Sequence, residues 1–473
     1  MAQARDLTGE AHKRFVSVVT LLALIDPVRG EPTVHSLDRH PHDGSGKQEN
    51  LQKKFLDSFA LICSTSSKGG ETASAVCLEQ GGPTGTVLRL ASNLGVSQDL
   101  IDRLHLVLGD LTAVASRVSS VREKESEILY KIIDLTQDKI RSLLARLCKP
   151  KIQDQVEVAI KDLDEDDYPL EGTEGTNFRN WIRNLPILTA LEPGTELSLL
   201  IPHVKWASQA KWVYSEQIEA LFCPSGEELP PWINCIYKLG RYFAAAKAML
   251  KLATAQRTIF EMIHVETVAA PEQQYFPPSK DKHALMAVLK RLLPKADHQK
   301  LMLQLGQTWL TSDPEQRFRK ACRLTLTVHA EMQLLTFYDH HPEFTPRLFY
   351  MGTSKKACFL CDKYISQHPL RMSVSASHQK LYPSWMPAPC SESSVRKAHK
   401  VRLWELSRQL EQTTARDLET RLGIRRPKSL DSTAGPSLTS MDSLTSGWLL
   451  AQLAIHPQPQ GTSTPNDESS ESE

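Results

Sequence analysis

The chain has 473 residues, of which 41% are hydrophobic and 23% are charged, and its formal net charge is +1. This composition is typical of globular proteins and excludes a chain that is disordered throughout, and the length predicts two or three domains. The charge excludes a strong overall field toward nucleic acid or membrane, although the acids beyond Lys428 leave a mildly basic body that permits nucleic-acid binding.

Cysteine usage and the N-terminal segment both indicate an intracellular protein. The nine cysteines run from Cys63 to Cys390 without the spacing of a disulfide framework, which suits a reducing compartment. The apolar run 15–25 is too short to span a bilayer, and no small-residue cleavage site follows it. We interpret it as part of a buried helix over residues 9–25, and we expect no membrane partner and a cytoplasmic or nuclear location.

The first part of the chain, residues 1–160, is predicted to be an N-terminal helical region. After the first helix, residues 50–63 are again helical, and glycine-rich turns separate them from a long helical pattern over 97–147. Apolar residues in that pattern recur every three or four positions, which predicts the amphipathic helices of a bundle core. This apolar stripe includes Leu104, Leu108, Leu111, Val114, Val118 and Val121.

Three further regions flank the part of the chain that carries chemistry. The acidic stretch 161–177 contains Pro and Gly and is predicted to be a linker or surface loop, and 178–315 a second helical region. The last stretch, 426–473, is rich in Ser, Thr, Pro and acids and is predicted to be a disordered tail. An apolar island at 448–455 either docks on the body of the chain, binds a partner or has no role.

Between these regions the pattern changes to alternating strands and helices. Predicted strands lie at 322–328, 347–351 and 371–377, and predicted helices at 331–338, 358–367 and 401–422. This order predicts a mixed α/β layer domain over 316–425. The fold class is therefore α+β multidomain, with a large all-helical N-terminal region followed by a small α/β/α domain and the tail.

Two short motifs lie at the starts of the two central helices of this domain. Glu331 follows His329 by two positions, and Cys361 follows Cys358 by three. One His and two Cys are good ligands for Zn²⁺, and three protein ligands leave the fourth tetrahedral position for water, which is the catalytic pattern. Glu331 would face the same pocket without ligating, where a proton shuttle is needed.

Each motif alone has an ordinary explanation. His-x-Glu occurs by chance in many proteins, a lone His is usually a satisfied core residue, and a lone Cys-x-x-Cys can be redox-active, structural or without a role. Here both motifs start a predicted helix, each after a predicted strand. Their joint occurrence in this order favours a deaminase-type zinc site.

On these residues the sequence resembles the cytidine deaminase-like superfamily and, within it, the Orientia-type deaminase-like family, which is widespread in fungi. The resemblance covers roughly residues 318–388 and rests on VHAEMQLL, LFYMGTSKKACFLCDKYI and SHQKLYPSW. It implies a cytidine-deaminase-like domain in which His329, Cys358 and Cys361 bind zinc and Glu331 is the catalytic proton shuttle. A long helical region ahead of the catalytic part also fits the layout of this family.

Two features depart from the superfamily pattern. Ala357 stands where a Pro usually precedes the first Cys. Nucleoside and tRNA deaminases also commonly place an Asn in the pocket ahead of the His motif, and this chain has no Asn between Asn234 and Asn466. No substrate contact of that kind is predicted, and the substrate class stays open.

Residues near the motifs supply candidate substrate contacts. The predicted contacts are Phe359, His378, Tyr382 and Trp385. The aromatic rings could stack on a base, with core packing as the alternative. Lys355 and Lys356 flank the pocket and could meet phosphate, with a solvated loop as the alternative.

The sequence therefore predicts a zinc-dependent hydrolytic deaminase of a cytosine- or adenine-type base, which is a hydrolase acting on C–N bonds of cyclic amidines. The substrate would be a nucleic acid or a nucleotide, and the helical region or the tail would bind a protein partner. One alternative is a non-catalytic deaminase-fold scaffold with a structural zinc, although the retained Glu331 argues against it. The other is a helical interaction protein without zinc.

Overall fold

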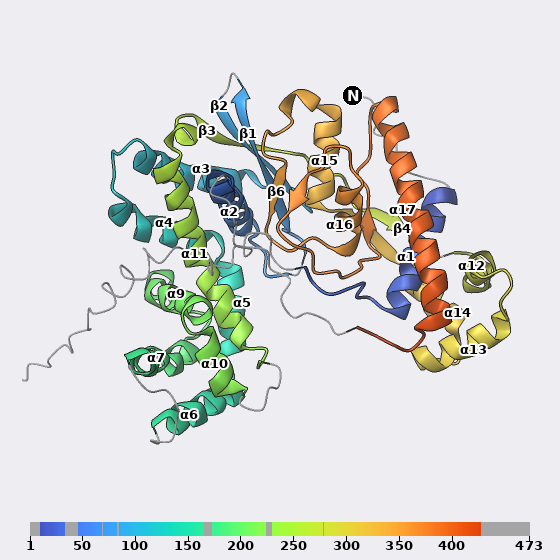
Figure 1. Cartoon of the computed structure of the whole chain (residues 1–473), viewed down its shortest axis with the longest axis horizontal. Coiled ribbons are helices and arrows are strands. Elements are labelled where there is room, and N and C mark those ends of the chain that lie inside the picture. The colour runs from blue at the N-terminus through green and yellow to red at the C-terminus, as the bar shows by residue number, and fades with distance from the viewer. Residues whose placement is uncertain are drawn as a thin grey trace, which may run out of the picture.

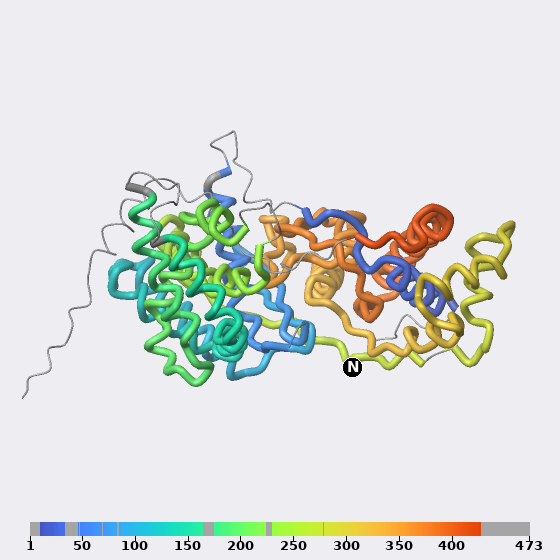
Figure 2. Tube along the Cα trace, turned by 90° about the horizontal axis from the view of Figure 1, so that it is seen from below, coloured from blue at the N-terminus to red at the C-terminus, as the bar shows by residue number. Residues whose placement is uncertain are grey.

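The computed structural model describes residues 10–33, 46–68, 70–82, 85–164, 173–223, 229–277 and 279–426. The molecule is elongated, with a lobe of helices at one end, a β-sheet in the middle and a smaller group of helices at the other end (Figures 1 and 2). Across the described ranges, no helix is both long and apolar enough to cross a lipid bilayer.

The helices and strands of the described residues follow one another along the chain with few long connections. The N-terminal helices are α1 (Glu10–Ile25), α2 (Lys47–Cys63), α3 (Gln98–Ala115), α4 (Val121–Leu135), α5 (Gln137–Leu147), α6 (Pro150–Asp164), α7 (Thr173–Ile182), α8 (Leu185–Ala190), α9 (Leu197–Trp212), α10 (Ser215–Phe222) and α11 (Ile233–Ala255). The later helices are α12 (Ala284–Leu292), α13 (His298–Trp309), α14 (Pro314–Ala321), α15 (Ala330–His340), α16 (Phe359–Ser366) and α17 (Ser393–Thr420), with short 3₁₀ turns at Arg257–Phe260 and Pro342–Phe344. The strands are β1 (Ser74–Gly82), β2 (Gly85–Ser92), β3 (Ile263–Thr267), β4 (Gln274–Phe276), β5 (Leu324–Val328), β6 (Tyr350–Thr353), β7 (Ser373–Val374) and β8 (Trp385–Met386).

A five-stranded mixed sheet in the order β3-β2-β1-β6-β7 forms the centre of the molecule. β1 and β2 are an antiparallel hairpin, and β6 pairs with the free edge of β1, also antiparallel. β3 is parallel to β2, and β7 is parallel to β6. The hairpin is closed by two glycines with positive φ, Gly81 at +84° and Gly85 at +94°, a backbone conformation that other residues rarely adopt.

Helices cover both faces of this sheet, because its inner strands carry apolar side chains on both sides. Val76 and Leu78 of β1 belong to the core shared with α2 and the helical lobe. Ala75 and Cys77, which point to the opposite face, belong to the core shared with α15 and α16. The result is a three-layer α/β/α arrangement, visible in Figure 1 with α2 and α15 on either side of β1, β2 and β6.

The two ends of the described chain lie together on the outer side of α15 and α16. α1 runs beside α17 (Figure 2), where Arg29 forms a buried ion pair with Asp417. A small sheet in the order β4-β5-β8 lies next to them. A third core joins α12, α13 and α14 to Leu21 and Ile25 of α1.

The predicted fold class is confirmed in outline, with one correction to the N-terminal region. That region is mostly helical rather than all-helical, because β1 and β2 lie within residues 1–160, and β3 and β4 lie within the predicted second helical region, 178–315. The central sheet takes its strands from all three regions that the sequence analysis separated, 1–160, 178–315 and 316–425. The domain limits drawn from the sequence remain predictions.

Most predicted elements around the two motifs are present with shifted ends. The helical pattern over 97–147 is three helices, α3 to α5, and the predicted strand over 371–377 is reduced to the two residues of β7. The predicted linker 161–177 overlaps the end of α6 and the start of α7, and its residues 165–172 lie outside the described ranges. The predicted tail, 426–473, also lies outside them except for Arg426.

Candidate metal centre

The first motif lies where β5 passes into α15. His329 is the N-cap residue of α15, with extended φ and ψ of −69° and 150°, so its side chain projects from the junction and is not part of the helix. Glu331 lies in the first turn of α15 and is 9% exposed. This strand-to-helix junction therefore presents an imidazole and a carboxylate to the same side of the chain.

The second motif is an N-cap built on a thiol. Cys358 precedes α16, and its Sγ accepts the backbone N–H of Cys361 at 3.4 Å. Ala357, immediately before it, donates its own N–H to the carbonyl oxygen of Ala376 at 2.9 Å. A Pro at this position has no N–H to donate, so the departure from the superfamily pattern supports a local backbone pairing.

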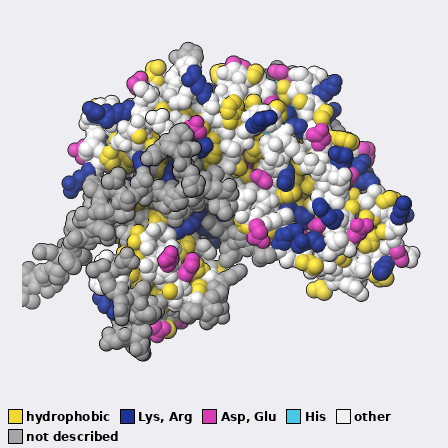
Figure 3. Space-filling model, in the orientation of Figure 1, with side chains coloured by type: hydrophobic (Ala, Val, Ile, Leu, Met, Phe, Trp, Pro, Cys, Tyr) yellow, Lys and Arg dark blue, Asp and Glu magenta, His cyan; other side chains and the backbone are white. Residues whose placement is uncertain are grey.

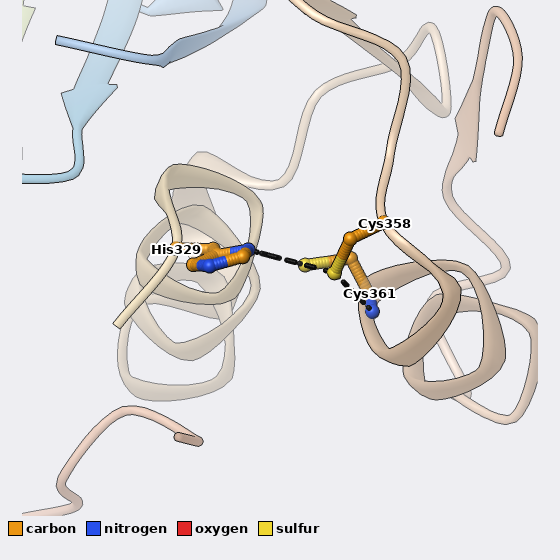
Figure 4. Close-up of side chains that lie close together, drawn as sticks. All are labelled: His329, Cys358 and Cys361. Carbon is orange, nitrogen blue, oxygen red and sulfur yellow. Dashed lines mark hydrogen bonds between the residues drawn. The ribbon is translucent and has the colours of Figure 1, made fainter. Parts of the chain in front are cut away.

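The side chains of the two motifs converge between α15 and α16 (Figure 4). Nδ1 of His329 is 3.6 Å from Sγ of Cys358 and 3.4 Å from Sγ of Cys361. The three ligand atoms all lie within 4.8 Å of one another, which is the arrangement of a group that could bind a metal ion. Among the described residues no fourth His, Cys, Asp or Glu joins this group.

Electrostatics in this site favour a thiolate beside a cation. Burial opposes ionisation of Cys358, but the hydrogen bonds from Cys361 and the charge of His329 hold the pKa of this thiol well below its ordinary value. Burial works against the charged imidazole too, yet the Cys358 thiolate raises the pKa of His329. Burial raises the pKa of the Glu331 carboxyl, so it binds a proton more readily than an exposed glutamate.

A cavity of about 500 Å³ opens onto this group. It is lined by Gly70, Glu71, Ala73, Asn93, Leu94, Gln273, Thr327, His329, Glu331, Lys355, Lys356, Cys358, His378, Tyr382 and Ser384. The lining contains one ligand from each motif together with the carboxylate of Glu331. The cavity is thus large enough for a small polar ligand to reach the candidate metal ligands and this carboxylate.

Asn93 supplies the pocket asparagine that the sequence analysis did not find. It follows β2, and its Oδ1 accepts the backbone N–H of Ala330 at 2.9 Å, across 237 positions of sequence. Its Nδ2 donates to the carbonyl oxygen of Gly70 at 2.8 Å. Gln333 reinforces the same junction by donating to the carbonyl oxygen of Ser92 at 3.0 Å. The hairpin is therefore bonded to the start of α15, and an Asn does stand in the cavity ahead of the His motif.

The four predicted substrate contacts divide into two pairs. His378 and Tyr382 line the cavity, and the Tyr382 side chain is partly exposed there, with its ring 6.1 Å from that of His329. Burial lowers the pKa of His378 to about 4, so this imidazole is neutral near pH 7. Their role as substrate contacts remains a prediction.

Phe359 and Trp385 do not line the cavity. Trp385 is fully buried, and its ring packs between Phe15 at 5.7 Å and Tyr364 at 5.9 Å. The ring therefore cannot stack on a base, which corrects the prediction for Trp385. Phe359 is 9% exposed and belongs to the core beneath the site, so the packing alternative describes it too.

A second cluster of ionisable residues joins α15, the end of α16 and α17. Oδ2 of Asp339 accepts hydrogen bonds from His368 at 3.0 Å, from His399 at 2.7 Å and from Arg402 at 3.1 Å. Burial opposes ionisation of Asp339, but the bonds from the two histidines hold its pKa well below its ordinary value. These His and Asp side chains also lie close enough to hold a metal ion. Because the Arg402 guanidinium donates to the same oxygen and would repel a cation, we interpret the cluster as a tie between α15, α16 and α17.

Comparison with known families bears directly on this geometry. Residues 328–389 match the model of a deaminase-like family. This stretch is a deaminase-type segment. The match confirms the resemblance predicted from the motifs, and it begins one residue before His329 and extends past Cys361. No curated protein and no solved structure matches the chain.

The deaminase-type segment contains all three candidate metal ligands and Glu331, but only part of the cavity. Asn93 and the loop around Gly70 lie far upstream of it in sequence. They lie too far from the motifs in sequence for local spacing to indicate that they share a cavity with them. The pair of apolar runs on either side of Gly81–Gly85 is typical of a hairpin and could have indicated β1 and β2, but not the contact of Asn93 with the His motif.

Proposed function

We propose that the chain is a zinc-dependent hydrolytic deaminase of a nucleobase, within the cytidine deaminase-like superfamily. The observation that carries this proposal is the convergence of His329, Cys358 and Cys361, because the first two line a cavity together with Glu331. A structural zinc site in proteins usually has four protein ligands and is closed. Three candidate ligands beside an open cavity, in a deaminase-type segment, favour a catalytic site.

Each of these side chains has a defined part in the proposed reaction, in which water replaces the exocyclic amino group and ammonia leaves. His329 and the two cysteines would hold the ion, and zinc in such a set supplies the nucleophile by lowering the pKa of a water molecule. Glu331 accepts the proton of that water and delivers a proton to the departing amine. The pKa of Glu331 is raised by burial, which suits a group that must both take up and release a proton.

Further residues would orient the base. Asn93 uses one amide hydrogen and one carbonyl lone pair in the bonds that hold the loops, which leaves one of each for a ligand. Neutral His378 and the partly exposed Tyr382 offer a polar edge and an aromatic face to the cavity. These groups can bind a planar heterocycle with hydrogen-bonding substituents.

The test is ammonia release by the full-length protein against a panel of substrates. The panel contains cytidine, adenosine, their deoxy forms and monophosphates, and single-stranded DNA and RNA. We expect at least one of these to release ammonia, and Glu331→Gln to reduce the rate by about 10²- to 10⁴-fold while the bound metal is retained, because this residue is a shuttle and not a ligand. Glu71→Gln is the matched control, since Glu71 lines the same cavity but is exposed.

Two outcomes would count against the proposal in different ways. If Glu331→Gln turns over the substrate at nearly the parental rate, the role of Glu331 is wrong. If metal-bound protein releases no ammonia from any member of the panel, the scaffold alternative is favoured instead.

A further inference from the structure

We propose that Lys355, with Lys238 and Lys380 beside it, forms a phosphate-binding subsite at the mouth of the cavity, so that the base to be deaminated carries a phosphate. This inference rests on the proposed deaminase function for the base itself. It defines the substrate class more narrowly, as a nucleotide unit that is either free or part of a nucleic acid strand.

The deaminase-type segment itself contributes three lysines around the start of α16. Lys355 and Lys356 line the cavity, just ahead of Cys358. Lys380 lies against the same helix start, because its carbonyl oxygen accepts the backbone N–H of Phe359 at 3.0 Å. These lysines are only partly exposed, so their charges are less screened than those of a freely solvated loop.

The helical lobe contributes two more lysines. Lys238 lies on α11, which packs against α2, and its charge acts on Lys355. Lys139 lies on α5, donates to Oγ of Ser64 at 2.6 Å just beyond α2, and is close enough to Lys355 for the charge of Lys355 to lower its pKa. The lobe and the deaminase-type segment thus meet in a group of positive charges beside the cavity.

Among the described residues, no carboxylate forms an ion pair with Lys238, Lys355 or Lys356, whereas ion pairs of lysine elsewhere in the helical lobe are common, as between Lys131 and Asp110. Burial and the neighbouring lysines lower the pKa of Lys355, and burial and Lys355 lower the pKa of Lys139 to about 7. Half-buried like charges are unfavourable in the absence of an anion, and a bound phosphate would remove the repulsion.

Neither of the two glutamates that line the cavity forms an ion pair with Lys355 or Lys356. Glu71 accepts the hydroxyl of Ser66 at 3.3 Å, and Glu331 is buried at the candidate metal ligands. The face of the molecule seen in Figure 3 mixes basic and acidic side chains outside its grey area. A phosphate is the anion that would accompany a nucleobase into this cavity.

The experiment measures binding to the full-length protein by titration calorimetry. The probes are cytidine and adenosine, their 5′-monophosphates, inorganic pyrophosphate and a short single-stranded oligonucleotide. We expect Lys355→Gln to weaken binding of phosphate-bearing probes by roughly tenfold or more, and Lys238→Gln to act in the same direction, because each removes a charge-assisted contact. Nucleoside binding should stay unchanged in both variants, and Lys295→Gln, an exposed lysine between α12 and α13, should match the parent throughout.

The outcomes separate the two proposals. Pyrophosphate binding that depends on Lys355 supports the subsite even if no nucleoside binds and the deaminase function fails. A Lys355 effect on the monophosphates identifies a nucleotide substrate, whereas an effect confined to the oligonucleotide identifies a nucleic acid backbone. If Lys355→Gln and Lys238→Gln bind every phosphate-bearing probe as the Lys295→Gln variant does, the subsite proposal is overturned.

Discussion

Two backbone N–H groups determine how the chain approaches the candidate metal ligands. The N–H of Ala330 is accepted by Oδ1 of Asn93, and the N–H of Ala357 is accepted by the carbonyl oxygen of Ala376. Each lies directly beside a ligand, His329 in the first case and Cys358 in the second. The positions of both ligands therefore depend on partners that are not themselves ligands.

Placing the proline that is usual in the superfamily at position 357 should lower the stability of this chain. Ala357→Pro removes the N–H and leaves the buried carbonyl of Ala376 without its partner, which costs about 1–3 kcal/mol. Urea denaturation of the parent and the variant measures this loss, and Ala357→Gly, which keeps the N–H, should lose less. A proline variant as stable as the parent would show that the bond to Ala376 contributes nothing.

At the scale of single residues, the sequence predicted the candidate metal ligands and Glu331 better than it predicted the residues around them. The spacings of His329, Glu331, Cys358 and Cys361 are local, so each motif could be located from its neighbours alone. Asn93 could not, because its contact with the His motif spans 237 positions and local spacing carries no information about such a pairing.

Among the elements, α2 and α15 hold the central sheet in different ways. α15 is held by a hydrogen bond to a charged group, because the hydroxyl of Tyr338 on α15 donates to Glu79 of β1 at 2.9 Å. Glu79 in turn forms an ion pair with Arg89 of β2. α2 is held by close backbone packing, because Gly352 of β6 leaves no room for a side chain. A Cβ at Gly352 would lie 2.2 Å from the backbone carbon of Leu56.

This close approach gives a direct stability prediction. Gly352→Ala should destabilise the protein by about 1–3 kcal/mol or more, because α2 must move away from β6. Gly109→Ala is the matched control: a Cβ there would meet nothing within 4 Å in α3, and alanine should stabilise the helix by about 0.5–1 kcal/mol. Thermal unfolding of the two variants should therefore shift in opposite directions, and equal shifts would refute the packing argument.

The elements that sequence patterns missed are those in which periodicity is hidden. β1 is buried on both faces, so Ala75, Val76, Cys77 and Leu78 form a continuous apolar run without the alternation of a half-exposed strand. β8 has two residues, too few to show any period, whereas β7 is the remnant of the longer strand predicted over 371–377. Helices such as α3 and α4 were predicted well because each has one exposed face and an apolar repeat of about 3.6 residues.

At the scale of the whole molecule, the helical lobe is inserted between neighbouring strands of one sheet. β2 ends at Ser92 and its parallel neighbour β3 begins at Ile263, with α3 to α11 between them. The first and last described helices, α1 and α17, pack together as well, and Arg426 donates to Asp26, just beyond α1, at 2.9 Å. Such pairings join segments far apart in sequence, which is why composition and local pattern predicted separate regions where the structure has one shared sheet.

The candidate metal centre depends on this whole assembly, because α15 and α16 are positioned by a sheet whose strands come from three regions of the chain. It is tested most directly by measuring bound metal in purified full-length protein. We predict about one zinc per chain, lost together with stability in Cys361→Ser, because ligand binding and local folding are coupled. Cys148→Ser, at a partly exposed cysteine in the helical lobe, should keep the metal. Parent protein that is folded and fully stable but binds no metal would contradict the assignment of His329, Cys358 and Cys361.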